Sequence, residues 1–280
     1  MPQIAFVLGG GGHLGAYQVG MLRALVERGL RPDLVVGTSV GAMNGAAVAA
    51  DPTIATVRQL ESVWLNLDAE PVFAASLFAG AARLARSRTH LQAIEPLREL
   101  VERLLPVRRF DELQVPFQCV AACIERAAEH WFSEGPLADA ILASAAVPGI
   151  LPPVEIGGEH FVDGGIVNSI PIERAVQLGA DVIYVLHVGR VDRKLEPPRN
   201  LREVAMVSFE IARRHRFARD MANLPEGVVG HVLPTGEEKP PRFSDLSQLR
   251  YRDFSDVAKR IAGAYGATEA YLDRAGVRAT

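Results

Sequence analysis

LVVGTSVGAMN, residues Leu34 to Asn44, is the stretch on which the predicted fold depends. It opens with three apolar residues bounded by Asp33 and Gly37, a pattern typical of a buried parallel strand. Gly37 and Gly41 then flank Ser39 in a G-x-S-x-G motif, and small residues with helical propensity follow. The stretch therefore predicts a strand, a tight turn and a helix, with the Ser39 hydroxyl raised above the sheet beside the positive end of the helix.

A second glycine-rich turn lies upstream. Ile4 to Leu8, IAFVL, has the composition of a buried strand and is followed directly by four consecutive glycines. A helix with an apolar face comes next, and then the strand that leads to Ser39. If the two strands are parallel neighbours, both loops leave the same edge of the sheet, and glycine amides converge on an oxyanion formed beside Ser39. The candidate donors are Gly10, Gly11 and Gly12.

The same loop also matches a nucleotide-binding fingerprint, which supplies an alternative. Gly10, Gly12 and Gly15 have the G-x-G-x-x-G spacing with which a Rossmann domain binds a pyrophosphate. That fingerprint also requires an acidic residue at the end of the second strand, where it holds a ribose. Here the second strand leads into Ser39, and Asp33 lies at its opposite end. The serine-centred interpretation is therefore favoured over a Rossmann-type nucleotide-binding protein.

Composition and charge narrow the classes of function. The chain has 280 residues, 49% of them hydrophobic, and a net charge of −3, which suits one large α/β domain or two small ones and disfavours nucleic-acid binding. Cys119 and Cys123 are spaced to lie on one face of a strand, as core residues rather than a disulfide. The sequence shows no metal-binding motif and no run of about 20 apolar residues that could span a bilayer. We expect the first apolar run to be a strand rather than part of a signal peptide, because it lacks a preceding basic segment and ends in glycines. We expect a cytoplasmic protein.

Residues 51–106 are predicted to be mainly helical. Apolar residues recur at helical spacing from Val57 to Trp64 and again from Leu97 to Leu104. Between these helices, residues 72–88 combine an apolar, alanine-rich run with three arginines. This segment is interpreted as a core helix with a basic end; the alternatives are a mobile cover over the site or a segment in peripheral contact with a membrane.

A second chemically suggestive turn occurs in the second half of the chain. Phe117–Ile124 and His130–Phe132 predict paired strands, and small residues predict a helix over Leu137–Ala146. The sequence FVDGG follows, in which Asp163 ends a strand and two glycines form a turn. Such a turn allows the carboxylate to approach a neighbouring group without steric crowding.

The remaining elements are predicted from the same patterns. They are a helix over Ile172–Leu178, a strand over Asp181–His187, a helix over Asn200–Met221, a strand over Val228–Leu233, and a C-terminal helix from Phe254 to Gly276. The long helix carries four arginines in its later half, Arg213, Arg214, Arg216 and Arg219. They are interpreted as a solvated helix face, with contact to anionic lipid as the alternative.

Taken together, GGGGHLG, GTSVG and DGG occur in the order found in patatin-like phospholipases, and the sequence resembles this family of lipid acyl hydrolases. GAYQVGMLRAL, ASAAVPGILPPV and DGGIVNSIP also resemble family blocks, so the resemblance covers residues 4–187. It implies a three-layer α/β/α fold with a mostly parallel central sheet. Residues 1–190 would form the catalytic core, and residues 191–280 a C-terminal extension packed on the same domain.

The resemblance also implies a Ser–Asp dyad. Ser39 would be the nucleophile and Asp163 its base, with the oxyanion hole at Gly10, Gly11 and Gly12. The glycines that would support these motifs are Gly15, Gly37, Gly41, Gly164 and Gly165. One position departs from the family, which usually has Arg or Lys where Leu14 stands; the neighbouring His13 either substitutes for that cation or faces solvent.

A Ser-His-Asp triad is the alternative within the hydrolases, in an esterase or acyltransferase that uses His187 at its predicted strand end. The glycine loop and the DGG turn favour the dyad. The resemblance then implies cleavage of a fatty-acyl ester, such as a phospholipid, through an acyl-serine intermediate, while acyl transfer to an acceptor other than water stays open. The expected partners are a lipid or acyl-ester substrate and a membrane surface contacted peripherally, with no cofactor and no metal.

Overall fold

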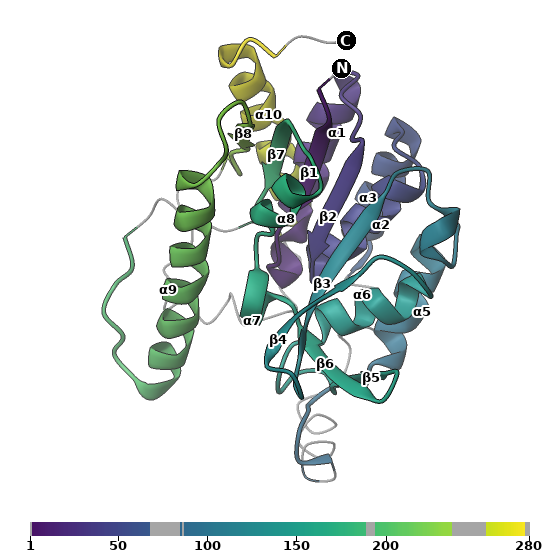
Figure 1. Cartoon of the computed structure of the whole chain (residues 1–280), viewed down its shortest axis with the longest axis vertical. Helices are drawn as coiled ribbons and strands as arrows, with labels where there is room; N and C mark the ends of the chain where they lie inside the picture. The colour runs from purple at the N-terminus through teal and green to yellow at the C-terminus, as the bar shows by residue number, and fades with distance from the viewer. Residues whose placement is uncertain (1, 68–84, 86, 189–193, 237–255, 278–280) are drawn as a thin grey trace.

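One mixed sheet organises the part of the chain that the structure describes (Figure 1). The structure is a computed structural model and describes residues 2–67, 85, 87–188, 194–236 and 256–277. The strands are β1 (Ile4–Leu8), β2 (Leu34–Thr38), β3 (Phe117–Cys123), β4 (Ala128–Phe132), β5 (Val154–Ile156), β6 (Glu159–Asp163), β7 (Val182–Leu186) and β8 (Val229–Val232). Their order in the sheet is β5-β6-β3-β2-β1-β7-β8, and β4 pairs with β3 outside this path.

The centre of the sheet is parallel and one side of it is antiparallel. β1 pairs in parallel with both β2 and β7, β2 with β3, and β7 with β8. β3 pairs antiparallel with β4 and β6, and β6 with β5. The carboxyl ends of β1 and β2 therefore lie at the same edge, as the two glycine-rich turns require. The predicted α/β fold with a mostly parallel sheet is confirmed.

Helices cover both faces of the sheet, which gives three layers. They are α1 (Ala16–Glu27), α2 (Val40–Ala50), α3 (Ile54–Leu65), α5 (Glu95–Leu104), α6 (Leu137–Ala145), α7 (Gly165–Asn168), α8 (Ile172–Gln177), α9 (Leu201–Ala222) and α10 (Val257–Arg274), with 3₁₀ turns at Gly12–Gly15 and Phe110–Glu112. One apolar core joins the sheet to α1, α2, α3, α5, α6 and α10. A smaller core on the opposite face joins it to α8 and α9, and α7 packs against α9.

Most predicted elements occur within a few residues of their expected positions. The predicted hairpin is the β3–β4 pair, and Cys119 and Cys123 are free, buried side chains in one core. β8 joins the sheet beside β7 and α10 packs on α1, so both belong to the main body; the division at residue 190 stays a prediction. Residues 72–84, the main part of the predicted basic-ended helix, lie outside the described residues.

Two features are absent from the described part of the chain. Within those ranges no helix combines the length and the apolar character needed to cross a bilayer. The same residues bring no three His, Cys, Asp or Glu side chains together in a way that could hold a metal ion.

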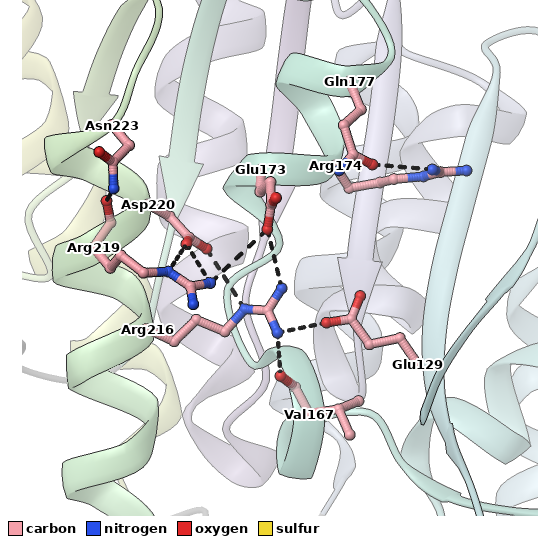
Figure 2. A network of polar contacts seen from close by, with 9 residues as sticks. All are labelled: Glu129, Val167, Glu173, Arg174, Gln177, Arg216, Arg219, Asp220 and Asn223. Atoms are coloured by element: carbon pink, nitrogen blue, oxygen red, sulfur yellow. Dashed lines mark hydrogen bonds and ion pairs between the residues drawn. The ribbon is translucent and has the colours of Figure 1, made fainter. Parts of the chain in front are cut away.

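The arginines of α9 form ion pairs rather than a solvated face. Arg213 and Arg214 both pair with Glu210, which is only 8% exposed. Figure 2 shows the partners of Arg216, which are Glu129 on β4, Glu173 on α8, Asp220 and the carbonyl oxygen of Val167. Arg219, half exposed, pairs with Asp220 and Glu173. The prediction of a solvated face was wrong, because these charges are paired with carboxylates of α9 itself, Glu210 and Asp220, and with Glu129 and Glu173 of other elements.

The crossing of α1 and α10 depends on Gly20. A Cβ atom at this position would overlap the carbonyl oxygen of Ile261 and lie 2.8 Å from the amide nitrogen of Tyr265. We expect Gly20→Ala to lower the free energy of unfolding by about 1–3 kcal/mol, because the helices must separate to accept the methyl group. Gly266→Ala is the matched control: nothing lies within 4 Å of its added Cβ.

Urea unfolding of both variants tests this packing. Gly266→Ala is expected to raise the free energy of unfolding by up to about 1 kcal/mol, since alanine is the better helix former. A Gly20→Ala variant that is as stable as Gly266→Ala would show that α1 and α10 do not meet at this close distance.

Candidate active site

Ser39 lies between β2 and α2 in a backbone conformation that is rare for a residue with a side chain. Its φ is 56° and its ψ is −123°. Conformations of this kind are costly and are concentrated at functional sites. The flanking glycines make the turn possible: a Cβ at Gly37 would lie 2.6 Å from the carbonyl oxygen of Gly41, and a Cβ at Gly41 would overlap the carbonyl oxygen of Leu8. The elbow therefore packs directly on β1.

Asp163 reaches Ser39 from the antiparallel side of the sheet. It is the last residue of β6, where it pairs with Ala121 of β3, the strand next to β2. Ser39 Oγ donates a hydrogen bond to Asp163 Oδ2 at 2.6 Å, and the amide of Gly165 donates to Asp163 Oδ1 at 2.7 Å. Ser39 and Asp163 are 6% and 7% exposed. The structure thus brings together two side chains that are 124 residues apart in sequence.

Burial changes the acidity of this carboxyl group. Desolvation disfavours the charged form and raises the pKa of Asp163 from 3.8 to about 6. The hydrogen bonds from Ser39 and Gly165 act in the opposite direction and limit the rise. At neutral pH Asp163 is therefore still ionised, but it is a stronger base than an exposed aspartate.

The glycine loop lies beside Ser39, although its three candidate donors are not equivalent. The amide of Gly10 donates to the carbonyl oxygen of Ser169 at 2.9 Å, so it is not available to an oxyanion; a Cβ at Gly10 would lie 3.4 Å from Cβ of Ser39. The amides of Gly11 and Gly12 have no acceptor among the described residues. Gly12 has a φ of 56°, which favours glycine. The prediction is corrected for Gly10: it leaves space for the Ser39 side chain, but its amide does not serve as an oxyanion donor.

The other supporting glycines also mark close approaches. Added Cβ atoms would overlap neighbouring atoms at Gly15 and Gly164, and at Gly165 a Cβ would lie 3.0 Å from Asp163 Oδ1. These positions leave no room for a side chain beside the elbow and the aspartate.

An apolar cavity of about 90 Å³ opens beside Ser39. Its walls come from four helices and the loop after α6, and include Val40, Met43, Trp64, Leu97, Ile141 and Ile150. Ser39 and His13 are among the few polar side chains in its lining. A cavity of this composition accepts a hydrocarbon group rather than a charged one.

A family model described as patatin-like phospholipase matches residues 6–176, which include the end of β1, both glycine motifs and the DGG turn. The chain belongs to the patatin-like phospholipase family. Related proteins agree: patatin-like phospholipase domain-containing protein 7 of Rattus norvegicus is 31% identical over 191 residues, or 68% of this chain. An uncharacterized NTE family protein of Mycobacterium bovis is 32% identical over 67% of this chain. Lysophospholipase nte1 of Aspergillus terreus is 28% identical over 68% of it.

These relatives are longer than the chain. The matching region covers 14% of the rat protein, 12% of the Aspergillus protein and 49% of the M. bovis protein. The similarity therefore concerns the patatin-like region that they share. Because the family match includes the G-x-G-x-x-G loop itself, it leaves the nucleotide-binding alternative without support.

The histidine proposed for a triad in this patatin-like chain lies on the other side of the sheet. His187 follows β7, and its ring lies 6.4 Å from the ring of Phe217 on α9. Phe217 belongs to the core beneath α8 and α9, whereas the cavity beside Ser39 is lined by helices of the opposite layer. The hydrogen bonds described for Asp163 come from Ser39 and Gly165. This geometry favours the dyad.

The structure places both Leu14, which stands where a cation was expected, and the neighbouring His13. Leu14 packs against the main apolar core in the position where the family usually has a cation. His13 is 6% exposed and lines the cavity beside Ser39. The alternative in which His13 faces solvent was therefore wrong.

A buried polar chain that the sequence analysis did not identify supports the glycine loop of this family member. Gln18 donates to the carbonyl oxygens of Gly9 and Leu186, and Asn44 donates to the carbonyl oxygen of Gly15 and to Gln18. The indole of Trp64 completes the chain by donating to Asn44 Oδ1 at 3.1 Å. Both ends of the loop are thus held by side chains of α1 and α2. Single amides on apolar helices gave no periodic signal that could have indicated this.

Proposed function

We propose that this protein is a serine lipid acyl hydrolase in which Ser39 is the nucleophile and Asp163 is its general base. The observation that carries the proposal is the 2.6 Å hydrogen bond to the buried Asp163 from the Oγ atom of Ser39, a residue that lines an apolar cavity. A nucleophile and a base within hydrogen-bonding reach of each other are the minimum requirement for acyl transfer to the enzyme.

The proton transfers follow from the position of Asp163. Ser39 Oγ attacks the carbonyl carbon of the ester while its proton passes to Asp163 Oδ2. The protonated carboxyl then gives this proton to the oxygen of the alcohol as its bond to the carbonyl carbon breaks. The alcohol departs, and the acyl group remains attached to Ser39. A water molecule, deprotonated by Asp163, attacks the acyl-serine, and the proton returns to Ser39 as the fatty acid departs. The raised pKa of Asp163, about 6, brings its basicity closer to the working pH.

Negative charge on the tetrahedral intermediate would be stabilised by the elbow and the loop. The amides of Gly11 and Gly12 have no acceptor within the described chain, and the eleven-residue helix α2 begins immediately after Ser39. The positive end of α2 and these bare amides both favour an anion at this position. Gly10 contributes the space that Ser39 needs.

The substrate class is inferred from the cavity and from the relatives. The walls are almost entirely apolar and would accept the acyl part of the ester, with its polar part directed outward. The Aspergillus relative is named a lysophospholipase, and other relatives are named patatin-like phospholipase domain proteins. We therefore infer that a phospholipid, lysophospholipid or other fatty-acyl ester is the substrate.

Covalent labelling and an ester series test this function. A serine-reactive fluorophosphonate is expected to label the wild-type protein at Ser39, as located by peptide mass spectrometry, and to leave Ser39→Ala unlabelled. With p-nitrophenyl esters, kcat/KM is expected to rise with acyl length as the chain fills the cavity. Labelling at another residue would contradict the proposal. So would an absence of turnover with every ester in an untreated sample of a preparation that the probe labels completely at Ser39.

A further inference from the structure

The last turn of α6 contacts both halves of the candidate site. Ser144 is completely buried, and its Oγ accepts a hydrogen bond from the backbone amide of Ser39 at 2.9 Å. The same Oγ donates to the carbonyl oxygen of Val120 on β3 at 2.6 Å. The hydroxyl therefore ties the backbone of the elbow to the strand that lies between β2 and β6.

The backbone of this turn holds the aspartate in the same way. The amide of Asp163 donates to the carbonyl oxygen of Ala146 at 2.9 Å, and the amide of Gly164 donates to the carbonyl oxygen of Ser144 at 3.1 Å. Residues 144–146 thus bind the main chain of Ser39 on one side and of the DGG turn on the other. The backbones of Ser39 and of the DGG turn are therefore both hydrogen-bonded to this one turn.

We infer that Ser144 is a positioning residue for the reaction: its hydroxyl fixes the backbone of Ser39 at the distance from Asp163 at which the two side chains share a hydrogen bond. The inference rests on the Ser39–Asp163 chemistry proposed above. The amide of Ser39 needs such a partner, because it is buried in a strained turn at the very start of α2, where helices leave amides without internal acceptors. Ser144 supplies that acceptor from a fully buried, hydrogen-bonded position.

Removing the hydroxyl should affect turnover more than binding. Ser144→Ala leaves the Ser39 amide without an acceptor, so the elbow relaxes and Oγ moves relative to Asp163. We expect kcat to fall about 10- to 100-fold while KM changes by no more than about twofold, because small displacements of reacting groups are costly and Ser144 does not line the cavity.

The pH profile distinguishes positioning from a general loss of packing. The groups that act on Asp163 are the Ser39 hydroxyl and the Gly165 amide, both of which lower its pKa against the effect of burial. If the bond from Ser39 weakens in Ser144→Ala, the pKa of Asp163 rises further, and the acid limb of kcat/KM moves up by about half a pH unit to one unit. A mutation that only loosens the core would lower stability without moving this limb.

Thr268→Ala is the matched control. Thr268 lies on α10, is completely buried, and its hydroxyl oxygen has no hydrogen-bond partner among the described residues. Its removal also deletes a buried hydroxyl, yet it should leave kcat and the acid limb as in the wild type. Melting temperatures of both variants, measured alongside the kinetics, separate stability from turnover.

Ser144→Cys keeps the test decisive if the alanine variant does not fold. Its larger sulfur and weak S–H group cannot reproduce contacts of 2.9 and 2.6 Å, so a partial loss of kcat and a shift of the acid limb in the same direction are expected. Wild-type kcat with an unmoved acid limb in either folded variant would overturn the inference. Ser39→Ala in the same assay separates the two proposals, since turnover that survives this substitution would contradict the proposed function itself.

Discussion

Replacing Ser39 with alanine is expected to lower ester turnover by about 10⁴-fold or more, because the attacking oxygen is lost and no acyl-enzyme can form. The backbone should stay in place. The amide of residue 39 keeps its bond to Ser144, and the elbow keeps its glycines. The variant should therefore fold, still take up the acyl chain in the cavity, and show no burst of p-nitrophenol when mixed with an ester.

His187→Ala serves as the comparison for this result. Because His187 lies against Phe217 on the opposite side of the sheet, its loss should change kcat by no more than a few-fold. A loss as large as that of Ser39→Ala would mean that the reaction uses a triad and that His187 reaches Ser39 in the working enzyme. Full turnover in Ser39→Ala would remove the serine from the mechanism altogether.

The elbow and the glycine loop could be predicted from the sequence because their signals are local. A short apolar run that ends in closely spaced glycines indicates a buried strand followed by a tight turn, and β1, β2 and the start of α2 confirm this pattern. The β3–β4 hairpin and α10 were predicted for the same reason, since their periodicity lies within one segment.

The meeting of Ser39 with Asp163 had no local signal. It depends on β3 pairing in parallel with β2 and antiparallel with β6, and strand order between distant segments is not encoded in any one of them. Here the resemblance to a family, rather than the composition of the FVDGG turn, indicated the pair. Two hydrogen bonds likewise form only when remote segments pack together. They join the Gly10 amide to the carbonyl oxygen of Ser169 and the Ser39 amide to the Ser144 hydroxyl.

Charge patterns were the least reliable guide. Four arginines on one helix look like a solvated or lipid-binding face, yet Glu129 and Glu173 reach Arg216 from elements more than 40 residues away (Figure 2). A helix considered alone shows its own charges but not those that will face it. Asp163 shows the same limit for a single carboxyl group, because its raised pKa comes from burial by segments that are remote in sequence.

Asp163→Asn is expected to lower turnover by about 10²- to 10⁴-fold and at the same time to stabilise the folded protein at neutral pH. The amide cannot accept the proton of Ser39, which accounts for the loss of turnover. Its oxygen can still accept from Gly165, and its NH₂ group can donate to Ser39 Oγ, so the geometry of the site is kept. What disappears is a negative charge buried in the interior.

The sign of the stability change follows from the pKa of Asp163, which is higher in the folded state, about 6, than the ordinary value of 3.8. Below pH 3.8 the carboxyl group is protonated in both states and the native enzyme carries no penalty. As pH rises through about 6 the folded state must ionise a buried group, and stability is lost. Two pKa units correspond to about 3 kcal/mol, which is the upper limit of the penalty that asparagine avoids.

Urea unfolding of the two proteins at several pH values measures this difference. The free energies of unfolding should be similar near pH 4, separate between about pH 4 and 6, and differ by a constant amount above about pH 7, with Asp163→Asn the more stable. Asp111→Asn, at an exposed position paired with Arg109, is the control and should show no such pH-dependent gain. If Asp163→Asn is inactive but no more stable than wild type at pH 8, the carboxylate is not desolvated, and its strength as a base must come from another source.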